Sequence, residues 1–441
     1  MRSQAKDLGQ TFLIPVLLFG IALVPRVLAL DLFLTVDEYR WLGRSRDFLA
    51  GLIVGDWGAT LQTGHPGVTT MWTGSLAILY RYWTRQSSAS DDLLTFVRQV
   101  PNEPLDVAYI APMRFPTVLL TSIFVVVFYV LVSRLFDDWR VGAVAALLLA
   151  LDPHHIGLSR VLHQDALQTT FMLLSLLPLL GYWLKGWSRR WLLLSAVAAG
   201  LSFLSKASAI FLIPFFVLLG LIWTLLRWRQ QEWQGWSELR RPFVDSLLWG
   251  IVACLTVFLF WPAMWVTPLK VLNVVFGLSS QYFGEADDEG IFFLGRVAQN
   301  PGPLFYPVAW LLRTTPLMVL GLVVWASISV PFVLNRRLEA RPSIGTLSAL
   351  LLIYALLFVT FLTLADKKQD RYLLPIYPAL AILAALGLVR VSAISYRVRN
   401  VRHRVHTPLA LIIFIILLFQ GILVKANYPY YFTYSIPSPL V

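Results

Sequence analysis

PTVLLTSIFVVVFYVLVS, residues 116–133, is a run of apolar and small polar side chains without a single charge. A helix needs about 20 mostly apolar residues to cross a bilayer, and a run of this kind is suited to that task. Comparable runs occur at residues 11–30, 140–151, 166–184, 191–204, 208–226, 244–262, 315–334, 344–364, 373–389 and 408–424. The pattern predicts an all-α membrane protein, a polytopic helical bundle with about eleven transmembrane helices.

The composition supports a membrane protein and excludes several other classes. Of the 441 residues, 58% are hydrophobic and only 14% are charged, whereas soluble domains are about a quarter charged. Continuous rather than alternating apolar runs argue against a β-barrel. The net charge of +12 is spread over short connections, so the chain lacks the single basic face of a nucleic-acid-binding protein. Membrane lipids, and no nucleic acid, are the expected partners.

The distribution of Lys and Arg predicts the orientation, because cytoplasmic loops carry an excess of both. With a cytoplasmic N-terminus, every inside connection is basic and the C-terminus lies on the outer face. We expect residues 1–441 to form one transmembrane domain in the cell membrane, with 11–30 kept as its first helix. Two long connections, 31–115 and 263–314, then lie outside. Within the first, segment 66–83 is predicted to be an interfacial helix at the membrane surface.

The first candidate site residues follow the first span, in LFLTVDEYRW at residues 32–41. It contains two adjacent acids, Asp37 and Glu38, and a nearby cation, Arg40. A carboxylate and a guanidinium together can deprotonate a hydroxyl and bind a phosphate. The alternative is that these residues are solvated charges at a membrane exit.

A second acid, Asp165, lies in SRVLHQDAL at residues 159–167, just before a predicted span. A carboxylate there is costly unless it is hydrated, paired or used. A favourable interaction with the helix dipole is the alternative. His154, His155 and His163 lie near it in the sequence, but their spacing matches no familiar metal motif.

Three further segments place cations or hydrogen-bond donors on the predicted outer face. Lys206, in the short turn FLSKASAI, is on the wrong face for a topology signal; it either extends to the interface or binds a lipid phosphate. Arg371 and Tyr372 belong to LADKKQDRYLLPIYPAL, and His65 to GHPG. Interface anchoring is the alternative for Arg371 and Tyr372, and a plain loop residue is the alternative for His65. Together with the two acidic positions, these groups are suited to an anionic lipid headgroup beside a nucleophile.

These motifs resemble the GT-C glycosyltransferases of family 39, which use polyprenyl-phosphate sugars and include protein O-mannosyltransferases and bacterial lipid A aminoarabinose transferases. VDEYRW is similar to the acidic pair that opens the family's first outer loop, and SRVLHQDAL to the segment with its second acid. GHPG is similar to a His-Pro-Pro segment, with Gly67 in place of the second Pro. FLSKASAI is similar to a Lys-Gly-Pro turn, with Ala207 and Ser208 replacing Gly-Pro. DRYLLP is similar to the family's Arg-Tyr-x-x-Pro stretch.

The resemblance implies a GT-C fold and an inverting transfer of sugar from a polyprenyl-phosphate donor to an acceptor hydroxyl on the outer face. The acceptor is a protein, lipid or glycan. It further implies that the catalytic residues are Asp37, Glu38 and Asp165. The residues implied to bind the donor phosphate are Arg40, Lys206, Arg371, Tyr372 and His65. The family chemistry does not clearly demand a metal, and a divalent cation held by the acids stays open.

Two other functions remain at this point. A transporter or flippase of polyprenyl-linked sugars or another anion would place its charges at mid-membrane depth and on broken helices. A membrane scaffold would tolerate replacement of Asp37 and Asp165. The charges here cluster at the predicted outer ends of the spans instead, and this favours the enzyme.

Overall fold

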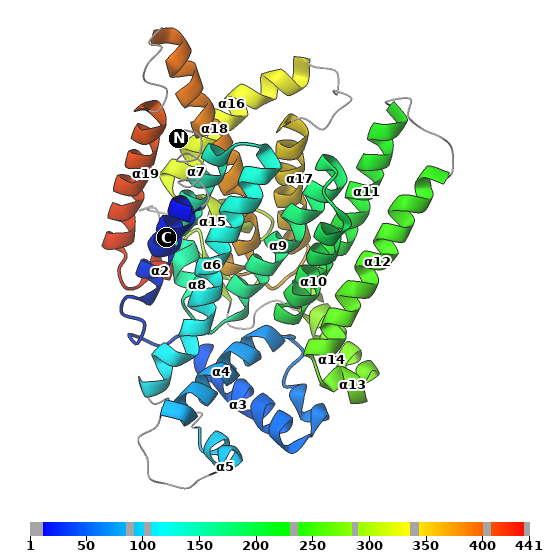
Figure 1. Ribbon diagram of the computed structural model, residues 1–441. Helices are drawn as coiled ribbons and strands as arrows, with labels where there is room; N and C mark the ends of the chain where they lie inside the picture. The colour runs from blue at the N-terminus through cyan, green and yellow to red at the C-terminus, as the bar shows by residue number, and fades with distance from the viewer. Residues whose placement is uncertain are drawn as a thin grey trace.

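The computed structural model describes residues 12–84, 92–100, 107–229, 237–284, 290–335, 344–399 and 407–435. These residues form a helical bundle, with further helices lying across one end of it (Figure 1). The helices of the bundle are α2 (Ile14–Val27), α6 (Ile110–Phe136), α7 (Trp139–Ala150), α9 (Gln164–Lys185), α10 (Arg189–Ser205), α11 (Leu212–Arg229), α12 (Ser237–Phe260), α16 (Pro316–Asn335), α17 (Ile344–Thr363), α18 (Tyr377–Arg399) and α19 (Thr407–Ala426).

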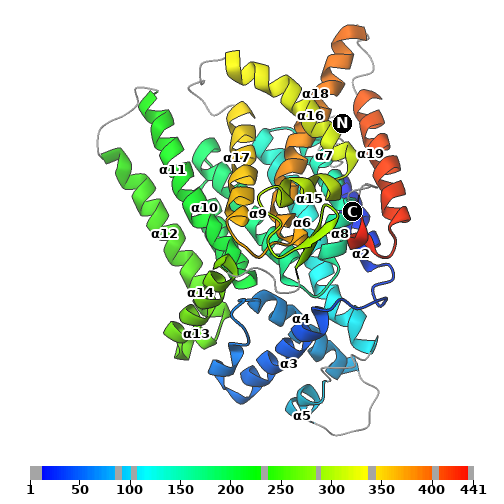
Figure 2. The same ribbon diagram turned by 180° about the vertical axis from the view of Figure 1, so that it is seen from behind.

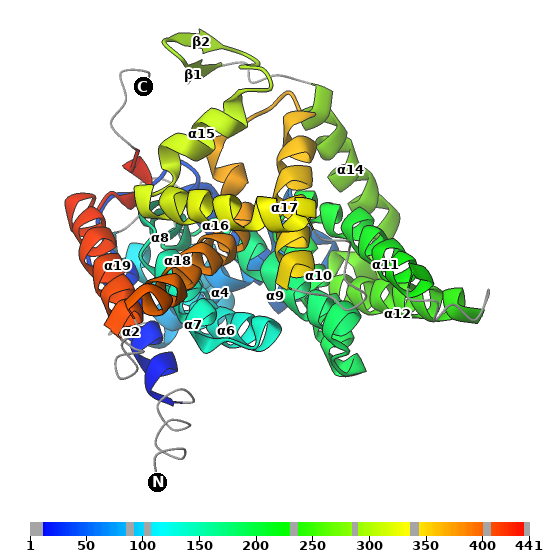
Figure 3. The same ribbon diagram turned by 90° about the horizontal axis from the view of Figure 1, so that it is seen from above.

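The remaining elements gather at and beside the end of the bundle where α9 begins (Figures 1 and 2). They are α3 (Glu38–Val54), η2 (Trp57–Thr60), α4 (Val68–Thr84), α5 (Leu93–Arg98), η3 (Val107–Tyr109), α8 (Pro153–Ser159), η4 (Ala207–Phe211), α13 (Ala263–Val266), α14 (Pro268–Gly284), α15 (Phe305–Arg313), η5 (Asp370–Ile376) and η6 (Tyr431–Thr433). A hairpin of β1 (Ile291–Phe293) and β2 (Arg296–Ala298) lies at one edge beside α15 (Figure 3).

Burial separates the helices of the core from those that present apolar side chains outward. Within their most apolar stretches, 89% of α9 and 94% of η5–α18 are buried, against 17% for α12 and α19. Exposed apolar faces suit a lipid environment, because acyl chains need no polar partner. The close contact of α16 with α18 depends on two glycines, since a Cβ on Gly387 would collide with the carbonyl oxygen of Gly321. The fold is therefore the all-α membrane bundle that the sequence predicted.

The number of membrane-spanning helices differs from the prediction of about eleven. Each predicted apolar run corresponds to a helix. Among the described residues, however, seven helices are long and apolar enough to cross, or nine if each of two bent pairs counts as one span. These pairs are α7–α8, bent by 67°, and α15–α16, bent by 114°. The count of eleven is not confirmed, because α2 and α10 have only 14 and 17 residues.

The predicted interfacial helix 66–83 is present as α4, one element of the layer across the end of the bundle. Its position at a membrane surface stays a prediction, as do the outer loops 31–115 and 263–314 and the single domain of 1–441. Arg2 and Lys6, which support the cytoplasmic placement of the N-terminus, lie outside the described residues.

A buried ion pair attaches the layer of short helices to the bundle. Glu38, at the start of α3, and Arg114, on α6, are both fully buried. Arg114 Nε and Nη2 each lie 2.7 Å from a different oxygen of the Glu38 carboxylate. The same carboxylate accepts hydrogen bonds from the backbone N–H and hydroxyl of Thr35 and from the N–H of Leu162. Arg114 also donates to three backbone carbonyls, at Leu30, Leu32 and Phe33.

We expect Arg114→Ala to lower the free energy of unfolding by about 3–5 kcal/mol, because removing one partner leaves a buried carboxylate unpaired. Thermal unfolding of the purified protein in detergent measures the effect. Lys185→Ala is the matched control, because Lys185 forms its ion pair with Asp137 at the surface. That substitution should change the free energy by about 1 kcal/mol or less. Equal destabilisation by both variants would contradict the anchoring role of Arg114.

Candidate active site

Asp37 occupies the N-cap position of α3, next to the anchored Glu38. Its side chain is 29% exposed, and its Oδ2 accepts a hydrogen bond from Arg371 Nη1 at 2.8 Å. A hydrogen bond from His163 and the charge of Arg371 hold the pKa of Asp37 well below its usual range. Asp37 is therefore a carboxylate that is partly open to solvent and fixed by two partners from other parts of the chain.

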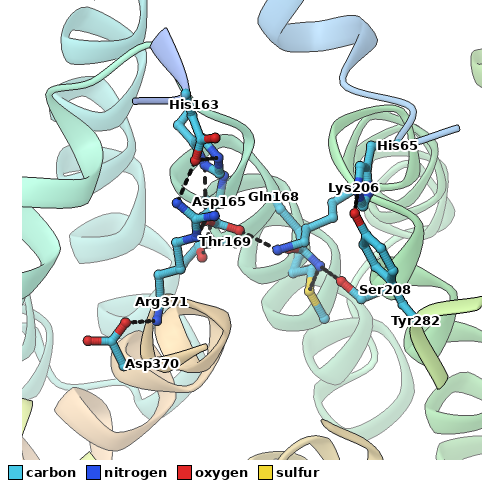
Figure 4. Close-up of polar contacts among 12 residues, drawn as sticks. His65, His163, Asp165, Gln168, Thr169, Lys206, Ser208, Tyr282, Asp370 and Arg371 are labelled. Atoms are coloured by element: carbon cyan, nitrogen blue, oxygen red, sulfur yellow. Dashed lines mark hydrogen bonds and ion pairs between the residues drawn. The ribbon is translucent and has the colours of Figure 1, made fainter. Parts of the chain in front are cut away.

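Asp165 lies in the first turn of α9 and is almost completely buried. Its Oδ1 accepts a hydrogen bond from Lys206 Nζ at 2.6 Å, and its Oδ2 lies 3.5 Å from Arg371 Nε (Figure 4). Lys206 follows the last residue of α10, so α10 returns the chain to the end of the bundle where α9 begins. Asp165 thus holds both cations through separate oxygens, and Arg371 links it to Asp37.

His163 is the residue that joins the two carboxylates. Its Nε2 lies 3.4 Å from Asp37 Oδ2, and its Nδ1 lies 3.0 Å from Asp165 Oδ2. The ring packs edge-on against Trp41, with centroids 6.2 Å apart. The sequence singles out His163 only as one of three neighbouring histidines. Its position two residues before Asp165, directly before a helix, is the signal that places both side chains at the same helix start.

The other two histidines of that segment have different partners. His155 Nδ1 lies 2.8 Å from Arg26 Nη2, and the His154 ring packs against Tyr377. Across the residues that the structure describes, no group of three or more His, Cys, Asp or Glu side chains is placed to hold a metal ion. Lys206 and Arg371 are the ion-pair partners of Asp165, so a divalent cation there would compete with them.

Lys206 and Tyr372 form a second contact of the cluster. The Lys206 ammonium lies 3.7 Å from the centroid of the Tyr372 ring. The electron-rich face of an aromatic ring attracts a cation at this position. Where the family that this chain resembles has a Lys-Gly-Pro turn, this chain has Lys206, Ala207 and Ser208. These two residues begin η4, and the Ser208 hydroxyl accepts a hydrogen bond from the Gln168 amide. Lys206 is therefore held at the site by a helical turn without glycine or proline.

His65 approaches from the loop before α4 and contacts Tyr282 of α14, with 2.7 Å between Nε2 and the phenol oxygen. Burial lowers the pKa of His65 to about 3, so the imidazole is neutral near pH 7. Gly67 has a positive φ of 55°, and a Cβ there would collide with the Trp41 ring. Its N–H donates to the carbonyl of Ser205. A second proline at this position could supply neither the φ angle nor the N–H.

Two cavities flank the cluster. One, of about 240 Å³, is lined by His65, Lys206, Tyr282, Tyr306 and Tyr372 together with apolar residues of α14 and α17. The other, of about 730 Å³, lies under the β-hairpin and α15 and is lined by apolar side chains with Arg313, Lys368, Asp370 and Arg371 at its polar side. The sizes are those of sites for small molecules or parts of larger ones. Lys206 is therefore reached from the smaller cavity and Arg371 from the larger one, whereas Asp37 and Asp165 do not line either cavity.

The Glu38 carboxylate lies apart from this group, and Arg40 lies on the exposed side of α3. Every contact of the Glu38 carboxylate described above goes to Arg114, Thr35 or Leu162. Arg40 is exposed, with Nε 3.2 Å from the Tyr39 hydroxyl. The structure thus brings Asp37, Asp165, Lys206, Arg371 and Tyr372 together, with His65 across the smaller cavity.

Arg44 is a further cation near the site that the sequence analysis missed. Its guanidinium lies 4.7 Å from the Trp41 ring centroid. Burial lowers the pKa of Arg44, and the charges of Arg40 and Asp37 act on it in opposite directions. Arg44 follows Asp37 by seven residues, which is about two turns of a helix, so both lie on the same side of α3. This spacing is the sequence signal that could have identified Arg44.

Comparisons with known proteins connect this geometry to a family. Residues 108–265 match the family model described as dolichyl-phosphate-mannose-protein mannosyltransferase. The matched region contains His163, Asp165 and Lys206, whereas Asp37 and Arg371 lie outside it. Over 290 residues the chain is 27% identical to an undecaprenyl phosphate-alpha-4-amino-4-deoxy-L-arabinose arabinosyl transferase of Pseudomonas aeruginosa. That alignment covers 63% of this chain and 46% of the relative, so the chain spans about half the length of the curated relatives it matches.

Solved structures show the same fold. ArnT of Cupriavidus metallidurans, solved bound to undecaprenyl phosphate, has a TM-score of 0.54 and 17% identity, and the match covers 93% of this chain and 69% of that one. The oligosaccharyltransferase AglB of Archaeoglobus fulgidus has a TM-score of 0.56 and 15% identity, with 97% and 56% covered. The recognition made from the sequence is confirmed: the chain is similar in sequence to lipid-phosphate-linked sugar transferases of the mannosyl and aminoarabinosyl type, and it has their GT-C membrane fold.

Proposed function

We propose that this chain is a membrane glycosyltransferase that transfers a sugar from a polyprenyl-phosphate donor to an acceptor hydroxyl. The observation that carries the proposal is the cluster of Asp37, Asp165, Lys206 and Arg371 between two cavities. Its members come from distant parts of the sequence and meet at one end of the bundle. Two carboxylates and two cations provide a base for a hydroxyl and a counter-charge for a phosphate. The comparisons support this class of reaction and give no support to a transporter.

The donor phosphate is proposed to bind beside Lys206 and Arg371. Both cations already contact Asp165, so this carboxylate balances their charge when no phosphate is present. Tyr372 and His65 line the smaller cavity with Lys206, and the remaining lining is mainly apolar. The polyprenyl chain would follow this apolar lining. Arg40 and Arg44 add positive charge on the exposed side of α3, where they attract an anionic donor.

The acceptor is proposed to enter the larger cavity, which Arg371 also lines. The Arg371 side chain joins this cavity to Asp37, with 2.8 Å between Nη1 and Oδ2. Asp37 orients the acceptor hydroxyl and removes its proton. The hydroxyl oxygen attacks the anomeric carbon on the side opposite the phosphate, the carbon–phosphate oxygen bond breaks, and the configuration inverts. Lys206 and Arg371 stabilise the negative charge that develops on the leaving phosphate.

Glu38 has a different proposed role from the other acids. With its oxygens occupied by Arg114, Thr35 and Leu162, it has no lone pair directed at a substrate. We assign it to holding Asp37 in place, since the two residues are adjacent. The site and the C-terminus are proposed to lie on the outer face of the cell membrane and the N-terminus in the cytoplasm, as the Lys and Arg distribution indicates.

Asp37→Asn should lower transfer by a factor of about 10²–10⁴, the usual effect of losing a general base. Proteoliposomes are supplied with a panel of undecaprenyl-phosphate-linked sugars and an envelope extract, and released undecaprenyl phosphate and transferred sugar are measured. Mass analysis of envelope lipids, glycans and proteins after gene deletion identifies the missing sugar and its acceptor. These are then included in the transfer assay. A variant that folds normally and turns over at nearly the wild-type rate would exclude Asp37 as the base.

Lys206→Ala and Arg371→Ala should weaken binding of undecaprenyl phosphate, because each removes a cation proposed to contact it. A loss of about tenfold in affinity corresponds to about 1.4 kcal/mol. Binding is measured by competition with a fluorescent polyprenyl phosphate in detergent. Lys185→Ala is the control for a surface cation and should bind as the wild type does. Unchanged affinity in both site variants would contradict the placement of the phosphate.

Filling the two cavities separately should produce different defects. Ser279→Trp, in the smaller cavity, should raise the dissociation constant of undecaprenyl phosphate by tenfold or more. Ala309→Trp, in the larger cavity, should leave that constant within about twofold but reduce transfer at least tenfold, since volume is lost on the acceptor side. The binding and transfer assays above distinguish the two. If only Ala309→Trp weakens the binding of undecaprenyl phosphate, the larger cavity binds the donor and the smaller one the acceptor.

A further inference from the structure

A groove lies between α2 and α19, at the edge of the bundle. The two helices lie side by side in two perpendicular views (Figures 1 and 3), and both pack on α7. The groove has a volume of about 740 Å³, and Leu151, directly after α7, is among the residues that line it. Of the described residues, none lines both this groove and a cavity of the candidate site. The groove is therefore a separate feature of the molecule.

The two walls of the groove run in the same direction and meet at one end. The α2 wall extends from Gly20 to Leu28, which is about 12 Å at 1.5 Å per helical residue. Arg160 joins the walls, because its Nη2 donates to the carbonyl of Leu28 and its Nη1 to the carbonyl of Pro429, just after α19. The C-terminal ends of both helices thus lie together, and the groove runs back from them along the bundle.

Two glycines deepen the groove without bringing the helices into contact. Gly20, on α2, and Gly421, on α19, both line it, and a Cβ built on either would meet open space. A Cβ on Gly387 of α18 would instead collide with the carbonyl oxygen of Gly321. Glycine in a membrane helix often permits close helix packing, and α16 and α18 use it in this way. The glycines of the groove leave room for a ligand.

The end of the groove where the walls meet is positively charged. Lys425, in the last turn of α19, is the one charged side chain among the described residues that line the groove. Arg160 lies behind the lining residue Tyr431, with its guanidinium 5.2 Å from the ring centroid. In the described parts of the chain, no carboxylate lies within ion-pair distance of either cation, and Arg160 donates to backbone carbonyls. This end is therefore complementary to an anion.

The rest of the groove is apolar and faces a lipid environment. Val24, Leu28 and Leu417 line it and are exposed, and only 17% of the most apolar stretch of α19 is buried. Water would find no polar partner along such walls, whereas an acyl chain needs none. Tyr428 lies at the charged end, as is typical of aromatic rings at the level of lipid headgroups. An acyl chain along the walls places its headgroup beside Lys425.

We infer that the groove between α2 and α19 binds an anionic phospholipid. One acyl chain lies along the apolar walls, and the Lys425 ammonium donates to a phosphate oxygen of the headgroup. Phosphatidylglycerol has a net negative charge, whereas the ammonium of phosphatidylethanolamine neutralises its phosphate. The groove should therefore prefer phosphatidylglycerol. This binding site is independent of the proposed transfer reaction and of its donor.

Filling the groove should weaken lipid binding. Native mass spectrometry of the purified protein, titrated with phosphatidylglycerol, measures the dissociation constant of the first lipid bound. Gly421→Leu should raise this constant tenfold or more, because the new side chain occupies the groove. Gly250→Leu is the matched control: this glycine of α12 also faces open space but does not line the groove, so its constant should stay within twofold. Equal affinity in the wild type and Gly421→Leu would overturn the inference.

Removing the cation should abolish the preference for the anionic headgroup. The wild type should bind phosphatidylglycerol about fivefold more tightly than phosphatidylethanolamine, the factor expected of one Lys beside an anionic headgroup. Lys425→Gln should bind the two lipids equally, within twofold. Lys185→Gln removes a cation that is paired with Asp137 and should keep the preference. A preference of wild-type size in Lys425→Gln would overturn the inference.

Two other occupants predict different results, and either result would overturn the inference. If the polyprenyl chain of the donor filled the groove, Gly421→Leu would weaken undecaprenyl phosphate binding in the competition assay, where we expect a change within twofold. If a second copy of the chain covered the groove, the wild type would have the mass of a dimer and Gly421→Leu that of a monomer. Lipid binding is measured without turnover, so a failed transfer assay rejects the proposed function alone.

Photo-crosslinking of the wild type tests the site without any variant. Phosphatidylglycerol with a diazirine in one acyl chain is added to the protein in detergent, and the labelled peptides are identified after irradiation. We expect more label on α2 and α19 than on α12. Helix α12 is the internal control, because the buried fraction of its most apolar stretch is 17%, as in α19. Equal labelling of all three helices would indicate unselective lipid contact and overturn the inference.

Discussion

The buried pairing of Glu38 with Arg114 is the interaction on which the geometry of the site depends. It joins α3 to α6, and its hydrogen bond from Leu162 N–H extends the connection to the segment that leads into α9. Asp37 is adjacent to Glu38 in the sequence, and His163 is adjacent to Leu162. A single carboxylate therefore links the segments that carry Asp37 and His163, two groups of the candidate site. Buried ion pairs of this kind hold only when every oxygen has a partner, as is the case here.

Charge compensation explains why so many ionisable groups can share a small volume at the end of a membrane bundle. Asp165 contacts Lys206 and Arg371 through different oxygens, and Arg371 extends to Asp37. Each of the two cations has a carboxylate partner, so the buried charges of the cluster are paired. In the proposed reaction, a bound donor phosphate would replace part of this pairing, and the two cations would stabilise it as a leaving group.

The surrounding fold gives this charged cluster access to two different environments. The smaller cavity combines Lys206, Tyr372 and His65 with apolar side chains, whereas the larger one lies beneath the β-hairpin. Helices α12 and α19 present apolar faces outward, and α9 and α18 form the interior that holds the site in place. Buried helices carry Asp165 and lead into Lys206 and Arg371, while elements around them, among them α14, α15, α17 and the β-hairpin, line the cavities. This division suits a reaction between a lipid-borne donor and a separate acceptor.

The sequence alone determined the all-α membrane class, the location of the apolar helices of the bundle and of α4, and four of the residues that the tertiary structure brings together: Asp37, Asp165, Lys206 and Arg371. Apolar runs and charges at their ends are local properties, so they can be read without a structure. Only the tertiary structure decided that Glu38 is an anchor, that His163 lies between the two acids, and that Arg44 and Tyr282 belong to the surroundings. The partners of these side chains lie far away in the sequence, since Glu38 pairs with Arg114 and His65 with Tyr282. The number of spans was also undecidable locally, because a short or bent helix crosses a bilayer only if its neighbours satisfy its ends.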